Sequence, residues 1–267
     1  MEGIFISTGP ALEEGIFVER PNRFLIRCAL KKAVDGVDCA RPRSLVEAHL
    51  PDPGRLKELL VPGRRIWLRS VNNIPRRKTK WTAVLTERPD GKGFVSLDST
   101  LPNRLIAKAL QRGVMEEFQG WSLLSAEFKM GHSRWDFLLA GPGESRLVLE
   151  VKSVTLVENG VGLFPDAITA RGTRHLQELA EIAQQPDWKA AALFVLQRDD
   201  ACRIEAARSI DQTFAAVLAE ARAAGVGVFG RRCIVTLEKV ILGERVPVVT
   251  PEEKNSLLKK YWSIPER

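Results

Sequence analysis

The sequence predicts a mixed α/β protein, α+β over the whole chain, with an OB-like β-barrel over residues 1–97 and a sheet flanked by helices over 98–267. Three observations support this. Short β-leaning segments separated by turns fill the first third of the chain. Residues that cap helices appear at Ser99 and Thr100, where the character of the sequence changes. After Leu101, helical and strand-like segments alternate, which favours a sheet covered by helices.

The barrel prediction depends on roughly five short strands. Residues 55–60 form a short helical turn between the loop at Pro53-Gly54 and the break at Pro62-Gly63. Around this turn, β-leaning or apolar runs occur at 15–18, 24–30, 45–50 and 93–95, and alternating runs occur at 65–68 and 81–85. Short strands in this number, with one small helix, are typical of a closed Greek-key barrel.

The second domain begins with a helix near Pro102 that ends before Gly113. A second helix is predicted over 166–185, with an apolar stripe of Ile168, Leu176, Leu179 and Ala183. The continuous apolar run at 191–196 favours a buried parallel strand. A third helix over 214–224 and a strand over 226–235 complete the pattern, and we expect residues 160–166 to form a loop.

The most informative stretch is 133–153, which predicts two strands joined by a turn at Gly141-Pro142-Gly143. Because strand side chains alternate between faces, Glu150 and Lys152 point the same way. If the two strands pair, Asp136 comes beside Glu150. Two carboxylates and an ammonium would then share one face of the sheet.

This trio suits a hydrolytic magnesium site. Mg²⁺ prefers oxygen ligands and is usually held by one or two carboxylates, so Asp136, Glu150 and the carbonyl of Val151 could bind Mg²⁺ or Mn²⁺. Such a metal activates water, and Lys152 would orient that water or offset charge in the transition state. The alternative is a surface ion pair between Glu150 and Lys152, with Asp136 solvated.

Three further residues of the second domain have two interpretations each. Glu127, on the preceding strand, is either a third metal ligand or an exposed strand residue. Arg171 and His175 lie four apart on the predicted helix and so can face the same neighbour. They would contact a DNA phosphate if the helix packs behind the hairpin, whereas a lone histidine is more often structural.

The charge distribution indicates a polyanion-binding module. Residues 1–95 hold 18 Lys and Arg against 11 Asp and Glu, so the whole net charge of +7 lies there. The basic loop at 72–80 lies between Trp67 and Trp81, and cations beside aromatic rings suit nucleic acid. Its basic residues are Arg76, Arg77, Lys78 and Lys80. A basic surface that only maintains solubility, and a core position for Trp67, are the alternatives.

Composition sets the remaining bounds. Hydrophobic residues make up 45% of the chain and charged residues 27%, as is ordinary for globular proteins. We expect no signal peptide, because residues 1–14 carry acidic residues and no basic segment followed by an apolar one. We expect no membrane span, because no apolar run is long enough. The four cysteines show no zinc spacing, which favours reduced thiols and a cytoplasmic location.

The sequence as a whole resembles the sugar fermentation stimulation protein family, SfsA, from about residue 15 to 249. The resemblance is carried, in order, by segments at 49–55, 62–63, 76–78, 102–105, 131–137, 149–156, 164–167, 171–172 and 175–176. Such an ordered series is far more specific than a single Glu-x-Lys. The chain departs from the family pattern at Ala170, where an acidic residue is expected, and it continues past the usual final strand.

This resemblance implies an OB-like barrel and a restriction-endonuclease-like domain of the PD-(D/E)XK type. It implies metal ligands at Asp136 and Glu150, an active-site lysine at Lys152 and DNA as the partner, and we extend the DNA-binding set to Arg55 and Arg134. The first functional hypothesis is a Mg²⁺-dependent DNA phosphodiesterase. The second is a non-cleaving DNA-binding regulator of sugar catabolism. We expect no membrane partner and allow for a homodimer.

Overall fold

The computed structural model describes residues 3–9, 11–30, 44–71 and 78–250. Contacts divide the chain into two compact units. The first comprises Met1–Leu101, Gln197–Asp199 and Cys233–Leu242, and the second comprises Pro102–Leu196, Asp200–Arg232 and Gly243–Arg267. Neither unit is one continuous segment, because the chain returns to the first unit twice.

The first unit contains the predicted barrel. Its strands occur in the order β4-β3-β2-β5-β6-β7, and a parallel pairing of β4 with β6 closes the sheet on itself. The bounds are β2 Glu13–Asn22, β3 Leu25–Leu30, β4 Ser44–His49, β5 Arg65–Ser70, β6 Trp81–Glu87 and β7 Phe94–Ser96. The interior is filled by alternating side chains such as Ile26, Cys28 and Leu68. The OB-like fold is therefore confirmed.

Trp67 is buried, and the helical turn expected over residues 55–60 forms. Trp67 is 5% exposed and its ring meets that of Phe94 edge-on at 4.8 Å. The amide of Leu60 donates to the carbonyl of Leu56 at 2.8 Å, which is the expected helical turn. Trp81 packs against the apolar cluster of the barrel interior. Trp67 is buried outside that cluster, because its neighbours Ile66 and Leu68 point inward and strand side chains alternate between faces.

The second sheet has seven strands in the order β1-β16-β15-β13-β10-β9-β8. It is mixed: β13 pairs in parallel with β10 and β15, whereas β8, β9 and β10 form an antiparallel meander. The bounds are β1 Phe5–Ser7, β8 Ser122–Met130, β9 Ser133–Ala140, β10 Arg146–Val154, β13 Trp188–Leu196, β15 Gly227–Val235 and β16 Lys239–Arg245. Pairing of β1 with β16 was not predicted, because three residues carry too short a pattern.

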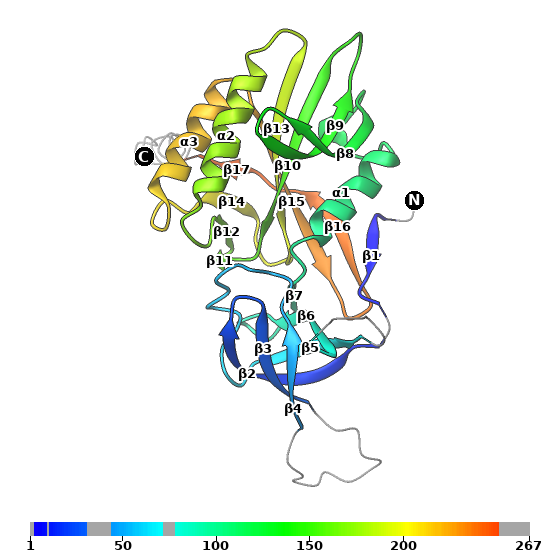
Figure 1. Cartoon of the computed structure of the whole chain (residues 1–267), viewed down its shortest axis with the longest axis vertical. Helices are drawn as coiled ribbons and strands as arrows, with labels where there is room; N and C mark the ends of the chain where they lie inside the picture. Colours follow the sequence, from blue (N-terminus) through cyan, green and yellow to red (C-terminus); the bar gives the residue numbers. More distant parts are fainter. Residues whose placement is uncertain (1–2, 10, 31–43, 72–77, 251–267) are drawn as a thin grey trace, which may run out of the picture. The chain divides into compact units, whose positions relative to one another are not determined.

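Three helices accompany this sheet in the described part of the chain: α1 Leu101–Gln111, α2 Ala170–Ala183 and α3 Gln212–Ala223, with a short 3-10 turn, η1, at Glu116–Phe118. Figure 1 shows α2 and α3 side by side against the sheet. Their apolar faces join the central strands in one buried cluster that includes Leu176, Leu179, Phe194, Phe214 and Leu218. Strand β13 is buried along nearly its whole length, as its continuous apolar sequence predicts.

Two expectations in this region are wrong. Residues 160–166 are not all loop: β12 Val161–Phe164 joins β11 Val157–Glu158, β14 Arg203–Ala206 and β17 Val248–Val249 in a small sheet. Gly162 suggested a loop, but it occupies a strand where a Cβ would come within 2.5 Å of Leu196 Cδ2. Helix α2 also begins later than predicted, after its N-cap Thr169, so Ile168 precedes it and is 81% exposed.

Within the described residues, no helix is long and apolar enough to cross a membrane.

Candidate functional site

The β9–β10 hairpin brings Asp136 and Glu150 together. Its antiparallel register pairs Leu149 with Phe137, so Glu150 and Asp136 occupy the next positions along the two strands. Phe137 and Leu149 are 2% and 0% exposed, and their burial ties this register to the core. A slip by one residue would turn these apolar side chains outward, which is why the register is well specified.

Asp136 is held by two donors. Asn103 Nδ2, from the first turn of α1, donates to Asp136 Oδ1 at 2.6 Å, and the backbone N–H of Val151 donates to Oδ2 at 2.7 Å. Asn103 was not among the predicted site residues. Its signal lay in the segment 102–105 that supports the family resemblance, where a polar residue opens an otherwise apolar helix face.

The surroundings of Asp136 oppose its ionisation. Burial and the nearby negative charge of Glu150 raise the pKa of Asp136 to about 6, against the lowering effects of the Val151 N–H, Lys152 and Asn103. Two carboxylates that come close in a buried place repel each other when both are ionised. A cation bound between them would relieve that repulsion.

Glu150 is buried and uses one oxygen for two contacts. Lys152 Nζ lies 2.7 Å from Glu150 Oε1, and His175 Nδ1 lies 2.8 Å from the same oxygen. Burial alone would raise the pKa of Glu150, but His175 and Lys152 outweigh it and hold the pKa below its usual value. The three side chains are only 2–12% exposed, so the alternative of a surface ion pair does not describe this site.

The other Glu150 oxygen, Oε2, is buried and has no hydrogen-bond partner among the described residues. Buried carboxylate oxygens normally have one, so Oε2 suits a ligand such as a metal ion. The carbonyl of Val151 is the third predicted metal ligand. The N–H and C=O groups of one strand residue point to the same side of the strand, and the Val151 N–H points to Asp136. The Val151 carbonyl therefore lies on the Asp136 side of β10, compatible with the predicted ligand role.

The donor set fits a cation that takes few protein ligands. No cluster of three or more His, Cys, Asp or Glu side chains with metal-binding geometry occurs in the part of the chain that the structure describes. A carboxylate pair with one unpartnered oxygen is a poor zinc site but a reasonable Mg²⁺ site, since Mg²⁺ keeps several waters.

The remaining predicted residues of this unit lie differently. Glu127 has a 73% exposed side chain that faces Arg134 at 3.9 Å, so it takes its exposed interpretation rather than that of a third ligand. Arg171 is exposed, as a DNA contact requires. His175, however, is 2% exposed and turned to Glu150, so its ring does not face a phosphate backbone as expected.

The predicted DNA-binding residues of the barrel lie at its surface where they are described. Arg55, Lys78 and Lys80 are exposed. Arg76 and Arg77 lie outside the described residues. The exposure of Arg55, Lys78 and Lys80 agrees with the predicted polyanion-binding role of the barrel.

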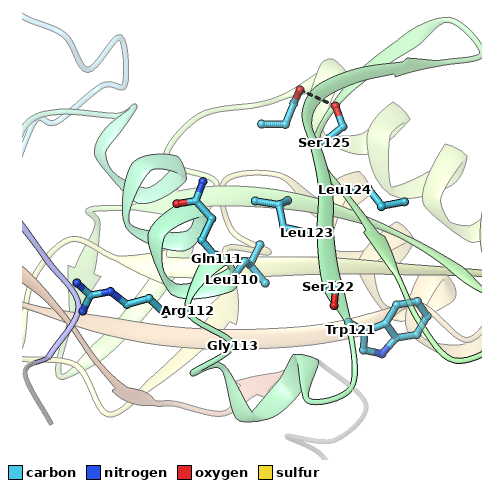
Figure 2. Close-up of a pocket in the computed structure, with 10 residues that line it drawn as sticks. Leu110, Gln111, Arg112, Gly113, Trp121, Ser122, Leu123, Leu124 and Ser125 are labelled. Atoms are coloured by element: carbon cyan, nitrogen blue, oxygen red, sulfur yellow. Dashed lines mark hydrogen bonds between the residues drawn. The ribbon is translucent and has the colours of Figure 1, made fainter.

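A pocket of about 690 Å³ opens between the end of α1 and β8 (Figure 2). Leu110 and Gln111 of α1 face Leu123 of β8 across it. Its one charged lining residue among those described is Arg112, and no predicted site residue lines it. The pocket and the carboxylate pair are therefore separate features of this unit.

The fold and the site together define a class: an OB-like barrel and a mixed sheet, with a hairpin in that sheet that places a half-buried Asp136 and a buried Glu150 beside a lysine. Two family models match, described as the SfsA N-terminal OB domain over residues 18–97 and the sugar fermentation stimulation protein RE domain over 100–239. The chain belongs to the SfsA family.

Relatives agree with this assignment. Sugar fermentation stimulation protein homologues from Shouchella clausii and Moorella thermoacetica are 42% and 45% identical over 90% and 83% of this chain, and over 98% and 90% of their own lengths. The solved structure of Pyrococcus furiosus SfsA in complex with Ca²⁺ superposes with a TM-score of 0.79 at 23% identity. It covers 93% of this chain and 100% of the archaeal one, and confirms the fold.

Proposed function

We propose that this protein hydrolyses DNA phosphodiester bonds with the help of Mg²⁺ or Mn²⁺ at Asp136 and Glu150, as a nuclease of the PD-(D/E)XK type. The observation that carries this proposal is the pair of Asp136, which is half-buried, and Glu150, which is buried, with Glu150 Oε2 unpartnered among the described residues and Lys152 alongside. Two neighbouring carboxylates beside one ammonium leave an excess of negative charge, which a divalent cation would neutralise.

The residues of the site have distinct roles in this proposal. Asp136, Glu150 and the Val151 carbonyl would hold the cation, which supplies activation of a water and of the phosphorus. Asn103 and the Val151 N–H keep the Asp136 carboxylate in one orientation. Lys152 orients the water or offsets the charge that develops on the phosphate oxygens.

Two further observations support the substrate and the cation. The net charge of +7, concentrated in residues 1–95, favours a polyanion, and the exposed Lys78 and Lys80 are available to phosphates. The archaeal SfsA was solved with Ca²⁺, a hard divalent cation with the same preference for oxygen ligands as Mg²⁺.

A second candidate is a DNA-binding regulator of sugar catabolism that does not cleave. The name of the family, sugar fermentation stimulation protein, favours this candidate. So does the lack, among the described residues, of a third acidic group at the carboxylate pair. Both candidates bind DNA and differ only in turnover.

The decisive experiment incubates the protein with single-stranded, duplex and branched DNA, each with Mg²⁺, Mn²⁺ or chelator. Asp136→Ala and Lys152→Met are assayed beside the wild type, with Glu127→Gln as a matched control because its side chain is exposed. We expect metal-dependent cleavage that falls at least about 100-fold in the first two variants and is unchanged in the control.

Binding is measured on the same samples by fluorescence anisotropy. Intact DNA in every metal lane, together with unimpaired binding by the wild type, would reject hydrolysis and leave the regulator. Cleavage that survives in Asp136→Ala would place the active site elsewhere.

A further inference from the structure

Helix α2 reaches the carboxylate pair through two residues one turn apart. Arg171 Nε lies 3.4 Å from His175 Nε2, and His175 Nδ1 lies 2.8 Å from Glu150 Oε1. His175 is 2% exposed and Glu150 is 6% exposed, so the second contact is buried. These two hydrogen bonds link the guanidinium of Arg171, at the surface, to the buried carboxylate of Glu150 through the imidazole of His175.

The direction of these contacts follows from the chemistry of the donors. A guanidinium nitrogen can only donate, so His175 Nε2 must accept from Arg171 and therefore carries no proton. In a neutral imidazole the proton then resides on Nδ1, which donates to Glu150 Oε1. Arg171 selects the tautomer, and the tautomer makes His175 a donor to the carboxylate.

The imidazole itself is fixed in place. Its ring lies 5.2 Å from that of Trp135, which is 1% exposed, and the next residue along, Leu176, is 0% exposed. Helix α2 is anchored at its start by Thr169, whose hydroxyl accepts from the amide of Gly172. The ring therefore has little freedom to release Glu150.

The consequence appears at the two oxygens of Glu150. Oε1 accepts hydrogen bonds from both His175 and Lys152, whereas Oε2 has no hydrogen-bond partner among the described residues. A carboxylate held by two donors on one oxygen presents the other in a defined direction. Mutation of residues that support a metal ligand in this way typically lowers metal affinity by about 10–100-fold.

We propose that Arg171 and His175 form a positioning relay that holds Glu150 with Oε2 directed to the divalent cation. His175 is a positioning residue, and Arg171 acts through it. The proposal rests on the cation site of the proposed function but does not require that the protein cleave DNA. It also assigns to α2 a contribution that the absence of an acidic residue at Ala170 had left open.

The test compares two substitutions of the same histidine. His175→Asn places an amide donor near the position of Nδ1, whereas His175→Leu fills similar space without a donor. Affinity for Mn²⁺ and Ca²⁺ is measured by titration calorimetry on the full chain without DNA, with Glu150→Gln as the variant that removes the ligand. Thermal unfolding of each variant reports on folding.

We expect His175→Leu to weaken cation binding by at least about tenfold and His175→Asn to restore most of that loss. Arg171→Met, which leaves the buried residues in place, should weaken binding by a smaller factor. It also keeps the proposal testable if His175→Leu does not fold. Equal affinity in the wild type and all three variants would overturn the relay, and equal weakening by Asn and Leu would reduce His175 to a packing role.

The two proposals fail separately. A wild type that binds the cation through Glu150 but leaves DNA intact would reject hydrolysis, while the affinity series would still decide the relay. A wild type that binds neither cation would overturn both.

Discussion

At the scale of single residues, Asp136 and Glu150 have opposite electrostatic environments although they are neighbours. Glu150 has two donors of positive or polar character on one oxygen, which lower its pKa despite burial. Asp136 has two neutral donors, and burial together with Glu150 raises its pKa to about 6. Ionised Asp136, the form that would bind a metal, is therefore less favourable in the folded protein than in the unfolded chain. Such perturbed pKa values are common at functional sites.

The raised pKa of Asp136 predicts a pH-dependent gain in stability for Asp136→Asn. Between the unfolded pKa of about 4 and the folded value of about 6, the folded protein binds more protons, so its free energy of unfolding falls as pH rises. The variant lacks this titration. We expect it to be more stable than the wild type by up to about 3 kcal/mol at pH 7 and similar to it near pH 4.

Urea unfolding at pH 4, 5, 6 and 7 in chelator measures this difference. Glu150→Gln is the matched control with the opposite sign, since its carboxylate is stabilised by Lys152 and His175 and its loss should destabilise the protein at neutral pH. A stability gain in Asp136→Asn that does not change with pH would contradict the electrostatic explanation.

At the scale of elements, the two helices over the sheet share one anchor. Asp211 is the N-cap of α3, where its Oδ1 accepts from the amide of Phe214 at 2.9 Å. Its Oδ2 accepts from the amide of Thr169, the N-cap of α2, at 2.9 Å. One buried carboxylate therefore satisfies donors at the starts of both helices, including the helix that carries His175.

Asp211→Ala should accordingly destabilise more than an ordinary cap substitution. It leaves two amide donors without this acceptor, so we expect a loss of about 2–4 kcal/mol in the free energy of unfolding. Asp211→Asn keeps one good acceptor and should lose roughly half as much. Urea unfolding of the three proteins checks the order, and an Ala variant within about 0.5 kcal/mol of the wild type would refute the shared anchor.

Element boundaries show where local patterns were sufficient. The end of α3 before Gly225 follows from local composition, because Gly225 adopts a φ of +98°. The start of α3 was predicted at Phe214, two residues late, because the capping role of Asp211 was not recognised. The start of α2 was placed too early because Ile168 fits the apolar stripe. The cap at Thr169 outweighs one apolar position, and Ile168 remains at the surface.

At the scale of the whole molecule, the charge asymmetry separates a basic N-terminal third from a neutral remainder. The exposed Lys78 and Lys80 lie in the basic part. If the barrel binds DNA through phosphates, each contact releases counterions and contributes to the salt dependence of binding.

Replacing Lys78 and Lys80 by Gln should therefore lower the slope of log affinity against log salt concentration by about 1.5. Anisotropy titrations at several salt concentrations measure the slope. The matched control replaces the exposed Lys189 and Arg208 of the second unit, with the same change in net charge. Equal slopes in the two double variants would mean that net charge, not the barrel, attracts DNA.

DNA binding by the barrel and cation binding at Asp136 and Glu150 should be affected by different substitutions. The Lys78 and Lys80 double variant is expected to keep the cation affinity of the wild type, because none of its changes touches Asp136, Glu150 or their donors. Calorimetry with Mn²⁺ on that variant tests this, and a loss of cation binding would show that the units do not act independently.

By itself, the sequence determined the barrel, helices α1, α2 and α3, strands β13 and β15, and the hairpin that brings Asp136 beside Glu150 and Lys152. These follow from short-range rules: alternation along strands, caps and turns, and a hairpin whose register is set by burial. The sequence did not predict strands β1, β12, β14 and β16. Tertiary structure alone decided the rest, because Asn103 and His175 come from helices 33 and 25 residues away from the carboxylates that they contact. No local pattern encodes contacts made across such distances, and it is packing of α1 and α2 within the second unit that orients both carboxylates and leaves one oxygen without a partner.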